Sequence, residues 1–212
     1  YVHHGFFLSM GVRDWQRFNE VILQTMDAPD LVQQIMQIQG ELAARLTERL
    51  LSQVDIDAAI FSEPIGGNDR PLLSPDMYEA FVLQSYTPVL DVLKRHGVPV
   101  IIFQTYANAA ILLPRVLRWG LNCLWACEVN EETMDYRRLR NRFGRQLRLI
   151  GGIDLDALRQ GKDAIKREIE TKVPPLLHQG GYVPLADGRV REDVPFENYV
   201  FYRQLVREIT QT

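Results

Sequence analysis

Polar side chains stand directly after five apolar segments of this sequence, where they could form a site for acid–base chemistry. They are Glu63, Gln104, Tyr106, Glu128, Asp154 and Asp187. Carboxyl groups can transfer protons, whereas amide and phenol groups orient a substrate by hydrogen bonding. A carboxyl group among apolar walls has a raised pKa and can act as a general acid or base, a role we expect of Glu63 or Glu128.

The candidate residues divide by role. Those expected to be catalytic are Glu63, Glu128 and Asp187. Those expected to bind substrate are Gln104, Tyr106, Asp154, Arg70 and Tyr182. The alternative for each residue is that it caps a helix or satisfies the backbone of a loop. The repetition of such residues at five strand ends favours a shared site.

The elements that must position these residues alternate along the chain. Short apolar runs predict strands over residues 56–61, 98–103, 121–126, 147–150 and 181–185, and the stretch 1–8 is a candidate sixth strand. Amphipathic patterns predict helices over residues 28–53, 74–97, 108–119, 134–143, 162–179 and 196–209. In the first of these, apolar residues recur at three- or four-residue spacing, at Leu31, Ile35, Ile38, Leu42, Leu46 and Leu50.

Alternating strands and helices predict a parallel α/β sheet, and nearly all-apolar strands predict that both of its faces are buried. An open doubly wound sheet and a (β/α) barrel both satisfy this pattern. Each places its ligand at the C-terminal ends of the strands, where the candidate residues stand. The glycine pairs at 66–67 and 151–152 allow the backbone to approach a ligand or another strand closely.

Composition excludes several classes of function. The chain has 212 residues and a net charge of -3, so its charge does not favour binding to nucleic acid or to an anionic membrane surface. No apolar run is long enough to span a bilayer, and no signal peptide opens the sequence. Only Cys123 and Cys127 are cysteines, which favours a reducing cytoplasm. The sequence begins YVHHGFF without an initiating Met, so we expect a partial chain.

Motifs for nucleotide binding and for a serine nucleophile elbow are absent from the sequence. The two cysteines have C-x3-C spacing without a nearby histidine, which is more typical of buried small side chains than of a zinc site. His96 and His178 stand late in predicted helices, where a helix C-terminus explains them. We therefore expect no metal ligands.

Four blocks of the sequence resemble the uroporphyrinogen decarboxylase superfamily in order and spacing. They are DAAIFSEPIGGNDRPLLSPDMYEAF, GVPVIIFQTYAN with LPRVLRWGLN, LRLIGGIDLDALRQGKDAIKREI and HQGGYVPLADGRVREDVPFENYVFYRQLV. The resemblance covers roughly residues 55 to 209. It implies one (β/α)8 TIM-barrel domain over residues 1–212, with about the last two-thirds of the barrel present and its first strands lacking. A barrel missing strands would need a longer natural chain, a partner or a swapped segment to close it.

The resemblance implies two chemistries. One is metal-free decarboxylation of the acetate side chains of uroporphyrinogen, in porphyrin biosynthesis. The other is methyl transfer from a corrinoid carried by a partner protein, with zinc bound by a His-x-Cys pair in the thiol-methylating branch. Gln104 and Tyr106 stand where that pair would be, and an amide and a phenol do not replace it. Glu63 stands at the position of a serine of the decarboxylases, and Gly188 at that of a histidine.

The leading expectation is a decarboxylase-like enzyme that acts on a tetrapyrrole or a similar small molecule without a cofactor. Carboxylates alone would repel such a polyacid, and Arg70, Arg189 and Arg191 could offset them. The second expectation is a corrinoid-dependent methyltransferase or demethylase component, and the third is a non-catalytic binding protein. The expected partners are a small-molecule substrate and, for methyl transfer, a corrinoid protein. The chain is also a candidate homodimer.

Overall fold

A computed structural model describes residues 1–128, 132 and 134–211. These residues form two compact units. Unit 1 comprises Tyr1–Ile65, Pro71–Gln104 and Ile111–Asn122, and unit 2 comprises Gly66–Arg70, Thr105–Ala110 and Cys123–Thr212. The prediction of one barrel domain over residues 1–212 stays a prediction.

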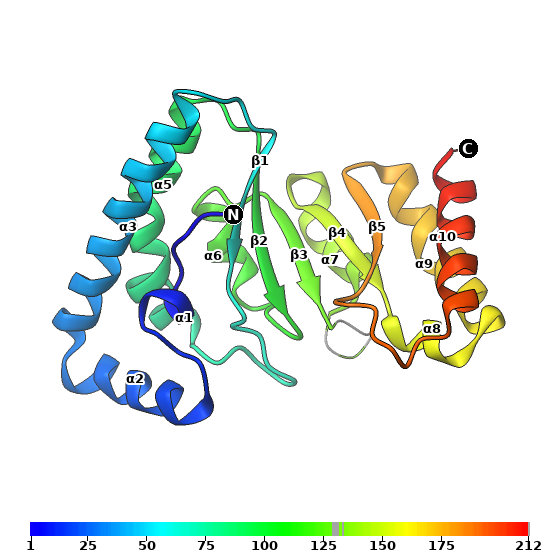
Figure 1. The fold of residues 1–212 in the computed structure, drawn as a ribbon, viewed down its shortest axis with the longest axis horizontal. Helices are drawn as coiled ribbons and strands as arrows, with labels where there is room; N and C mark the ends of the chain where they lie inside the picture. The colour runs from blue at the N-terminus through cyan, green and yellow to red at the C-terminus, as the bar shows by residue number, and fades with distance from the viewer. Residues whose placement is uncertain (129–131, 133, 212) are drawn as a thin grey trace. The chain divides into compact units, whose positions relative to one another are not determined.

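Unit 1 contains two parallel strands with helices packed beside them (Figure 1). Strand β1 (Ala58–Ser62) pairs with β2 (Val100–Tyr106), and this places Ser62 opposite Gln104. The last two residues of β2 belong to unit 2. The helices are α1 (Phe6–Ser9), α2 (Trp15–Asp27), α3 (Pro29–Leu51), α4 (Pro75–Met77), the π-helix η1 (Tyr78–Leu83), α5 (Gln84–Arg95) and α6 (Leu113–Arg118).

Local sequence signals account for several helix starts in unit 1. Ser74 caps α4 by accepting a hydrogen bond from the backbone N–H of Met77 at 3.2 Å, and Pro75 occupies the first helical position. Asp14 caps α2 in the same way through the N–H of Arg17 at 2.7 Å. Helix α2 was not among the predicted helices. Pro29 begins α3, which packs along α5.

Helix α3 buries a different face from the one that its apolar spacing suggests. The buried face of α3 consists mainly of small residues and one methionine, and it includes Val32, Met36, Gly40, Ala43 and Ala44. The spaced residues Leu31, Ile38, Leu42, Leu46 and Leu50 are exposed. Gly40 explains the choice of face, because a Cβ there would stand 2.1 Å from the carbonyl oxygen of Ser85. The small residues let α3 approach α5 closely, which the larger leucines would prevent.

The candidate sixth strand over residues 1–8 is wrong. The chain forms the short helix α1 from Phe6, and Val2 contacts β1 through a 2.9 Å hydrogen bond from its N–H to the carbonyl of Ile60. The predicted helix start at Asn108 is also wrong, since α6 begins at Leu113. The Asn108 side chain instead accepts a hydrogen bond from the N–H of Ala110, which forms a turn.

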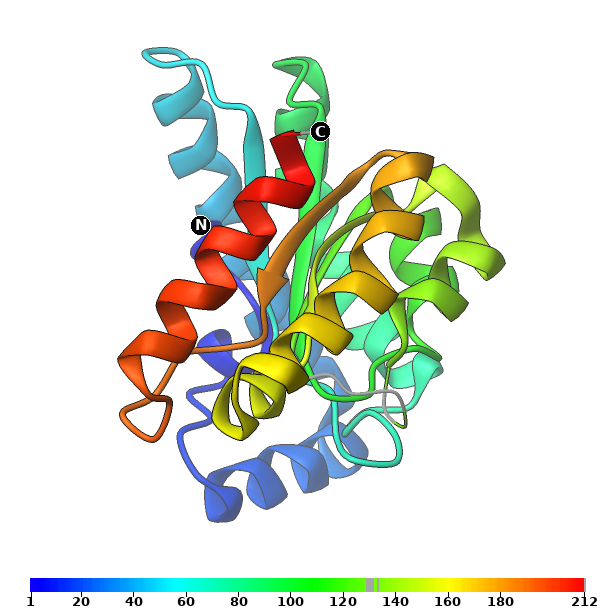
Figure 2. The same ribbon diagram turned by 90° about the vertical axis from the view of Figure 1, so that its right-hand side faces the viewer.

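Unit 2 contains three parallel strands in the order β3–β4–β5, which are β3 (Cys123–Cys127), β4 (Arg148–Ile153) and β5 (Tyr182–Ala186). Helices α8 and α9 pack against each other and against α10, the last helix of the chain (Figure 2). The helices of unit 2 are α7 (Tyr136–Phe143), the 3-10 helix η2 (Gly144–Gln146), α8 (Leu155–Gln160), α9 (Lys162–Gln179) and α10 (Phe196–Gln211). All five predicted strands exist, with ends that differ by up to three residues.

None of the helices in the described part of the chain is long and apolar enough to cross a membrane. The cytoplasmic location stays a prediction.

Candidate active site

A polar pocket of about 350 Å³ lies in unit 2, where strands β3, β4 and β5 end. Its lining includes Glu128, Asp154 and Asp187, each of which follows one of these strands. Parallel strands present their C-terminal ends at one edge of a sheet, so the three residues line one pocket. The prediction that strand-end residues gather is therefore confirmed for these three. Their predicted chemical roles stay predictions.

The three carboxyl groups differ in burial. Asp187 is 3% exposed, and its backbone N–H donates to the carbonyl of Ile153 at 2.9 Å. Asp154 is half-buried and caps α8, because its carboxylate accepts the N–H of Asp156 at 2.8 Å. Glu128 is exposed and has a φ of 57°, a left-handed conformation that non-glycine residues seldom adopt. Asp187 is thus the buried acid of the pocket.

Arginines supply the opposite charge at this pocket. Arg159, Arg189 and Arg191 all line it. Arg191 lies 3.5 Å from the Glu128 carboxylate, and both side chains are largely exposed. Arg159 pairs with Asp156, and its Nε donates to Asp193 at 2.7 Å. The sequence drew attention to Arg189 and Arg191 but not to Arg159. The pocket can therefore hold a ligand that carries both carboxylates and hydrogen-bond donors.

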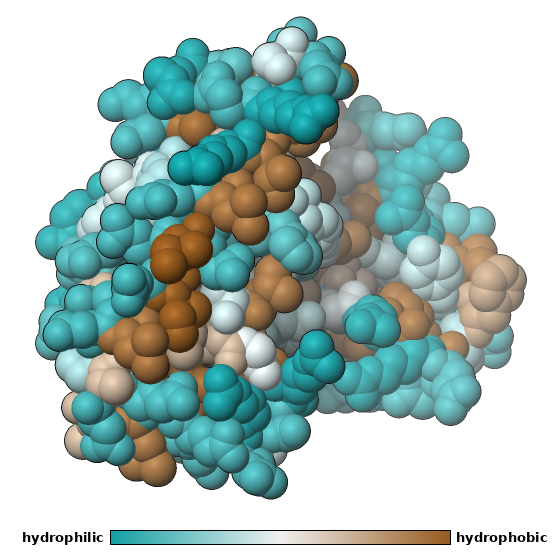
Figure 3. Space-filling model, turned by 60° about the vertical axis from the view of Figure 1, so that its left-hand side comes forward, coloured by the Kyte–Doolittle hydropathy of each residue, from teal (hydrophilic) through white to brown (hydrophobic). Residues whose placement is uncertain are grey.

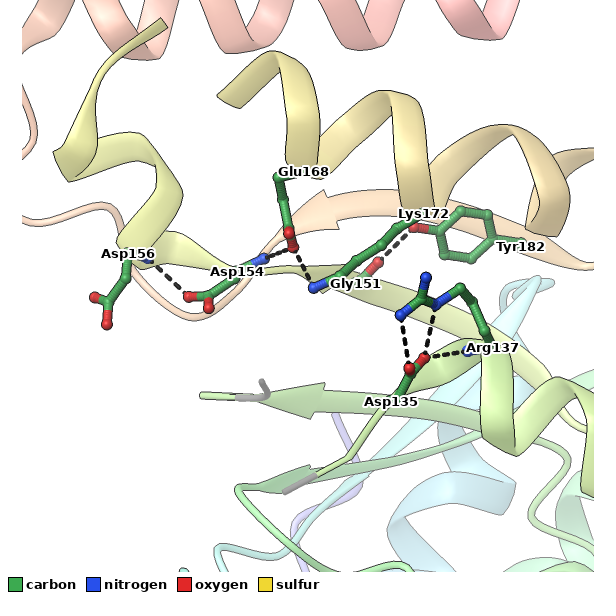
Figure 4. Close-up of polar contacts among 8 residues, drawn as sticks. All are labelled: Asp135, Arg137, Gly151, Asp154, Asp156, Glu168, Lys172 and Tyr182. Carbon is green, nitrogen blue, oxygen red and sulfur yellow. Dashed lines mark hydrogen bonds and ion pairs between the residues drawn. The ribbon is translucent and has the colours of Figure 1, made fainter. Parts of the chain in front are cut away.

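An ion pair beside Asp154 holds the turn that carries this residue (Figure 4). Glu168 accepts the backbone N–H of Asp154 at 2.8 Å and the ammonium group of Lys172 at 2.6 Å. Lys172 is 8% exposed, so the pair is well shielded from water. Neither residue was predicted to serve the site. The sequence shows that Glu168 and Lys172 are four residues apart on a predicted helix, which allows an ion pair. It does not show that Glu168 also binds the backbone of Asp154, which belongs to another element.

Two buried tyrosines also hold the strand ends. The Tyr136 hydroxyl accepts the N–H of Ala126 at 2.9 Å and donates to the carbonyl of Ile150 at 2.8 Å, which joins β3 to β4. The Tyr202 hydroxyl accepts the N–H of Ala186, the last residue of β5, at 2.8 Å. Burial raises the pKa of Tyr136 well above its usual value, so this phenol stays protonated.

Other predicted binding residues of unit 2 are not part of the pocket lining. Tyr182 begins β5, and its hydroxyl donates to the carbonyl of Gly151 at 2.9 Å (Figure 4). Tyr106 ends β2 and is 36% exposed, and Arg70 is an exposed loop residue. Their substrate-binding roles stay predictions. A side chain cannot be accommodated at Gly66, because a Cβ there would stand 1.6 Å from the Tyr106 carbonyl oxygen.

Glu63 lies in the interior of unit 1, directly after β1, with no exposed surface. Its Oε1 accepts hydrogen bonds from the Tyr86 hydroxyl at 2.8 Å and from the backbone N–H of Phe6. Burial raises the pKa of Glu63 to about 7, although both hydrogen bonds oppose the rise. Gly5 makes room for the carboxylate, because a Cβ there would meet Oε1 at 2.4 Å. The raised pKa agrees with the expectation for a carboxyl group among apolar walls.

Gln104 is also part of unit 1 and lies inside β2 rather than after it. Its carbonyl accepts the N–H of Glu63 at 2.8 Å, so these two predicted residues are neighbours. Gln104 is 9% exposed. The predicted contact of Gln104 with a substrate stays a prediction.

His4, which belongs to no motif of the sequence, is 1% exposed and contacts two serines. Its Nε2 lies 2.8 Å from the Ser85 hydroxyl, and its Nδ1 lies 3.0 Å from that of Ser9. The Ser85 hydroxyl donates its proton to the carbonyl of Val82, so Nε2 must be the donor to Ser85. Burial lowers the pKa of this ring to about 4, so the ring is neutral near pH 7 and its Nδ1 accepts the proton of the Ser9 hydroxyl.

The two cysteines do not have the properties of metal ligands. Cys123 and Cys127 are buried and unpaired with each other, and burial raises their pKa values to about 12 and about 11. Over residues 1–128, 132 and 134–211, no group of three or more His, Cys, Asp or Glu side chains could hold a metal ion. The absence of a metal remains an expectation from the sequence.

Comparisons with known proteins match most of this chain to one family. The family model described as uroporphyrinogen decarboxylase (URO-D) matches residues 13–209. A curated uroporphyrinogen decarboxylase of Legionella pneumophila strain Corby is 25% identical over 205 residues, which are 93% of this chain and 53% of the relative. The protein of strain Paris is 25% identical over 203 residues, with the same coverage. The chain thus spans about half the length of the curated relatives it matches.

Proposed function

Because the chain belongs to the uroporphyrinogen decarboxylase family, we propose that it is part of an enzyme that removes carboxyl groups from a small molecule, with a tetrapyrrole as the expected substrate. Members of the family fold as (β/α)8 barrels, and the alternating parallel strands and helices of this chain are part of such a barrel. The observation that carries the proposal is that four acidic residues and three arginines line one pocket where β3, β4 and β5 end.

The charges of the pocket suit a substrate that carries several carboxylates. Arg189 and Arg191 are exposed at the pocket and can each bind a carboxylate through two parallel hydrogen bonds. Asp154 and Asp187 can accept hydrogen bonds from N–H or O–H groups of the same molecule. A volume of about 350 Å³ lies within the range of about 300–1,000 Å³ that is usual for small-molecule sites.

The proposed reaction breaks the bond between a carboxylate carbon and the carbon that bears it, and carbon dioxide leaves. The electron pair of that bond stays on the remaining carbon, where it is delocalised over the substrate, and a proton then adds there. The net change is replacement of a carboxylate by hydrogen, which consumes one proton and needs no oxidant. We assign the proton transfer to Asp187, because it is the buried acid of the pocket. Arg189 and Arg191 would hold the carboxylates that remain.

The test uses the longest native polypeptide that contains this chain. It is incubated anaerobically with uroporphyrinogen, and the products are separated by their number of carboxylates. We expect stepwise loss of carboxylates, and we expect Asp187→Asn to reduce the rate by about 100-fold or more if it is the proton donor. Glu192→Gln changes an exposed carboxylate outside the pocket lining and serves as the matched control.

A lack of product beside an active decarboxylase control would overturn this function. The next assay would then supply methylcobalamin and a thiol to test methyl transfer. Binding of uroporphyrinogen without turnover in either assay would indicate a binding protein. Normal activity of Asp187→Asn would leave the function standing but remove Asp187 from the proton transfer.

A further inference from the structure

A cluster of arginines lies in unit 2 at the N-terminal ends of β4 and β5, the ends away from the arrowheads in Figure 1. Residues 136–153 contain six arginines and no aspartate or glutamate. Arg140 comes from α7, Arg145 from η2 and Arg148 from the start of β4. The acidic pocket lies at the other ends of the same strands, so the cluster is separate from the candidate active site.

The three side chains gather around the turn formed by Gly180 and Gly181, which precedes β5. Arg140 donates to the carbonyl of Gly181 at 3.1 Å. The Nη2 of Arg145 lies 3.6 Å from the place that a Cβ of Gly180 would occupy. The Cγ of Arg148 lies 3.8 Å from the corresponding place at Gly181. Three successive elements thus bring three positive side chains to one turn.

Arg140 is the buried member of the cluster, with 3% of its surface exposed. It donates to the carbonyls of Gly144 and Gly181, and its buried Nε has no hydrogen-bond partner in the described part of the chain. Burial lowers the pKa of Arg140, and the charge of Arg145 lowers it further. Within the described ranges, no carboxylate lies at ion-pair distance from Arg140, Arg145 or Arg148. A buried charge without an opposite charge is costly, which favours a bound anion.

Two helix C-termini offset part of this positive charge. Helix α7 ends at Phe143 and α9 ends at Gln179, and a helix C-terminus carries about half a negative charge. Cys123, which pairs with Arg148 across β3 and β4, adds no charge, because burial raises the pKa of its thiol to about 12. Of the three positive charges, about two therefore remain without compensation.

A phosphate group matches the remaining charge. A phosphate monoester has a second pKa of about 6, so it carries between about −1.5 and −2 charges at pH 7, and its three terminal oxygens accept hydrogen bonds. Guanidinium groups bind such oxygens through two parallel hydrogen bonds. A single carboxylate carries one charge on two oxygens, and it would leave about one positive charge unpaired.

We propose that the turn at Gly180 and Gly181, with Arg140, Arg145 and Arg148 around it, binds the phosphate group of a small molecule. Arg145 and Arg148 are exposed and contact the phosphate, whereas Arg140 holds the turn and adds its charge. The same chemistry suits free phosphate and a phosphate ester. This inference does not depend on the proposed function, because it concerns the opposite ends of the strands.

The first experiment titrates inorganic phosphate into the longest native polypeptide that contains this chain, by calorimetry at an ionic strength held constant with chloride. We expect saturable binding. Arg145→Gln and Arg148→Gln should each raise the phosphate Kd by about 10-fold, because each removes a charge-assisted contact. Arg140 is left intact, since its bonds to two carbonyls make it part of the fold.

Arg142→Gln is the matched control, and its phosphate Kd should stay unchanged. Arg142 is an exposed arginine of the same helix, and its guanidinium lies 4.9 Å from the centre of the Phe143 ring. It is two residues from Arg140, so the two side chains do not face each other. A lack of saturable binding, or equal weakening by the control and the two cluster variants, would overturn the proposal.

The second experiment compares acetate, inorganic phosphate, glycerol phosphate and a short DNA duplex under the same conditions. Phosphate should bind about 10-fold or more tightly than acetate, because it carries more charge. Tighter binding of glycerol phosphate than of inorganic phosphate would identify an ester as the ligand, and the reverse order would identify free phosphate. Equal affinities for acetate and phosphate, or binding of the duplex without binding of phosphate, would contradict the proposal.

The third experiment measures the repulsion within the cluster by unfolding in urea at low salt. Without phosphate, Arg145→Gln removes a charge that repels Arg140, so this variant should have a higher unfolding midpoint than the unmodified protein. Phosphate at about 10 times its Kd should raise the folding equilibrium constant of the unmodified protein by about 10-fold and that of the variant much less. The order of the two midpoints should therefore reverse. The same order in both buffers would count against a phosphate site at this turn.

Discussion

Two buried ionisable residues of unit 1 make stability depend on pH in opposite directions. Glu63 has a pKa raised to about 7, and His4 has a pKa lowered to about 4, in both cases because burial disfavours the charged form. Each shift is a difference in proton binding between the folded and unfolded chain, so each can be measured as a slope of stability against pH.

For Glu63, the folded chain holds a proton that the unfolded chain releases above its ordinary pKa of 4.5. Stability is therefore highest below that value and falls as the pH rises toward about 7. From about pH 5 to about pH 8, this one site should cost on the order of 2 to 3 kcal/mol. Glu63→Gln stays neutral, so its free energy of unfolding in urea should lack this loss. Parallel curves for the two proteins would contradict the raised pKa.

For His4, the unfolded chain binds a proton below pKa 6.5, whereas the folded chain stays neutral down to about 4. Its contribution is fully present above pKa 6.5 and is lost as the pH falls. Between about pH 6.5 and about pH 5 the loss should be about 2 kcal/mol, and His4→Gln should not show it. The measurement is the free energy of unfolding in urea of both proteins over this pH range. A variant that keeps the full acid sensitivity would assign it to another group.

At the scale of elements, the turn between β4 and α8 depends on a contact from α9. Glu168 accepts both the N–H of Asp154 and the ammonium group of Lys172. Glu168→Ala removes both contacts at a shielded position, and it should lower the free energy of unfolding by about 3 kcal/mol.

Glu170→Ala on the same helix is the control for this change. Glu170 and Lys166 are exposed and lie 3.9 Å apart, so removing their contact should cost less than about 0.5 kcal/mol. Chemical denaturation of the two variants compares them directly. Equal losses would mean that the Glu168 contact does not hold the turn.

At the scale of the whole molecule, the exposed apolar row of α3 (Ile38, Leu42, Leu46 and Leu50; Figure 3) should couple stability to protein concentration if the chain is the homodimer that its sequence suggests. If two chains associate through it, the unfolding midpoint in urea rises as the protein concentration increases. At a concentration about 100 times the dimer Kd, the added stability is about 2.7 kcal/mol. Leu42→Glu should unfold at one midpoint regardless of concentration. A concentration-independent midpoint for the unmodified chain would contradict association.

The sequence by itself determined the alternation of strands and helices, because apolar runs and amphipathic periods report on local burial. It also determined which residues follow the strands, and the parallel arrangement then brings Glu128, Asp154 and Asp187 together. The sequence predicted the helical segment between Ser74 and Gly97 from its N-cap serine and its C-terminal glycine, because these signals act over only a few residues.

Only the tertiary structure decided which side of α3 is buried, because Gly40 permits close packing on α5 and the leucine row does not. It also decided that Glu63 is enclosed by Phe6 and Tyr86, residues far from it in sequence. Hydrogen bonds between distant elements leave no local pattern, and a pKa depends on all the groups that surround the acid. For these reasons the candidate residues were visible in the sequence, whereas their environments were not.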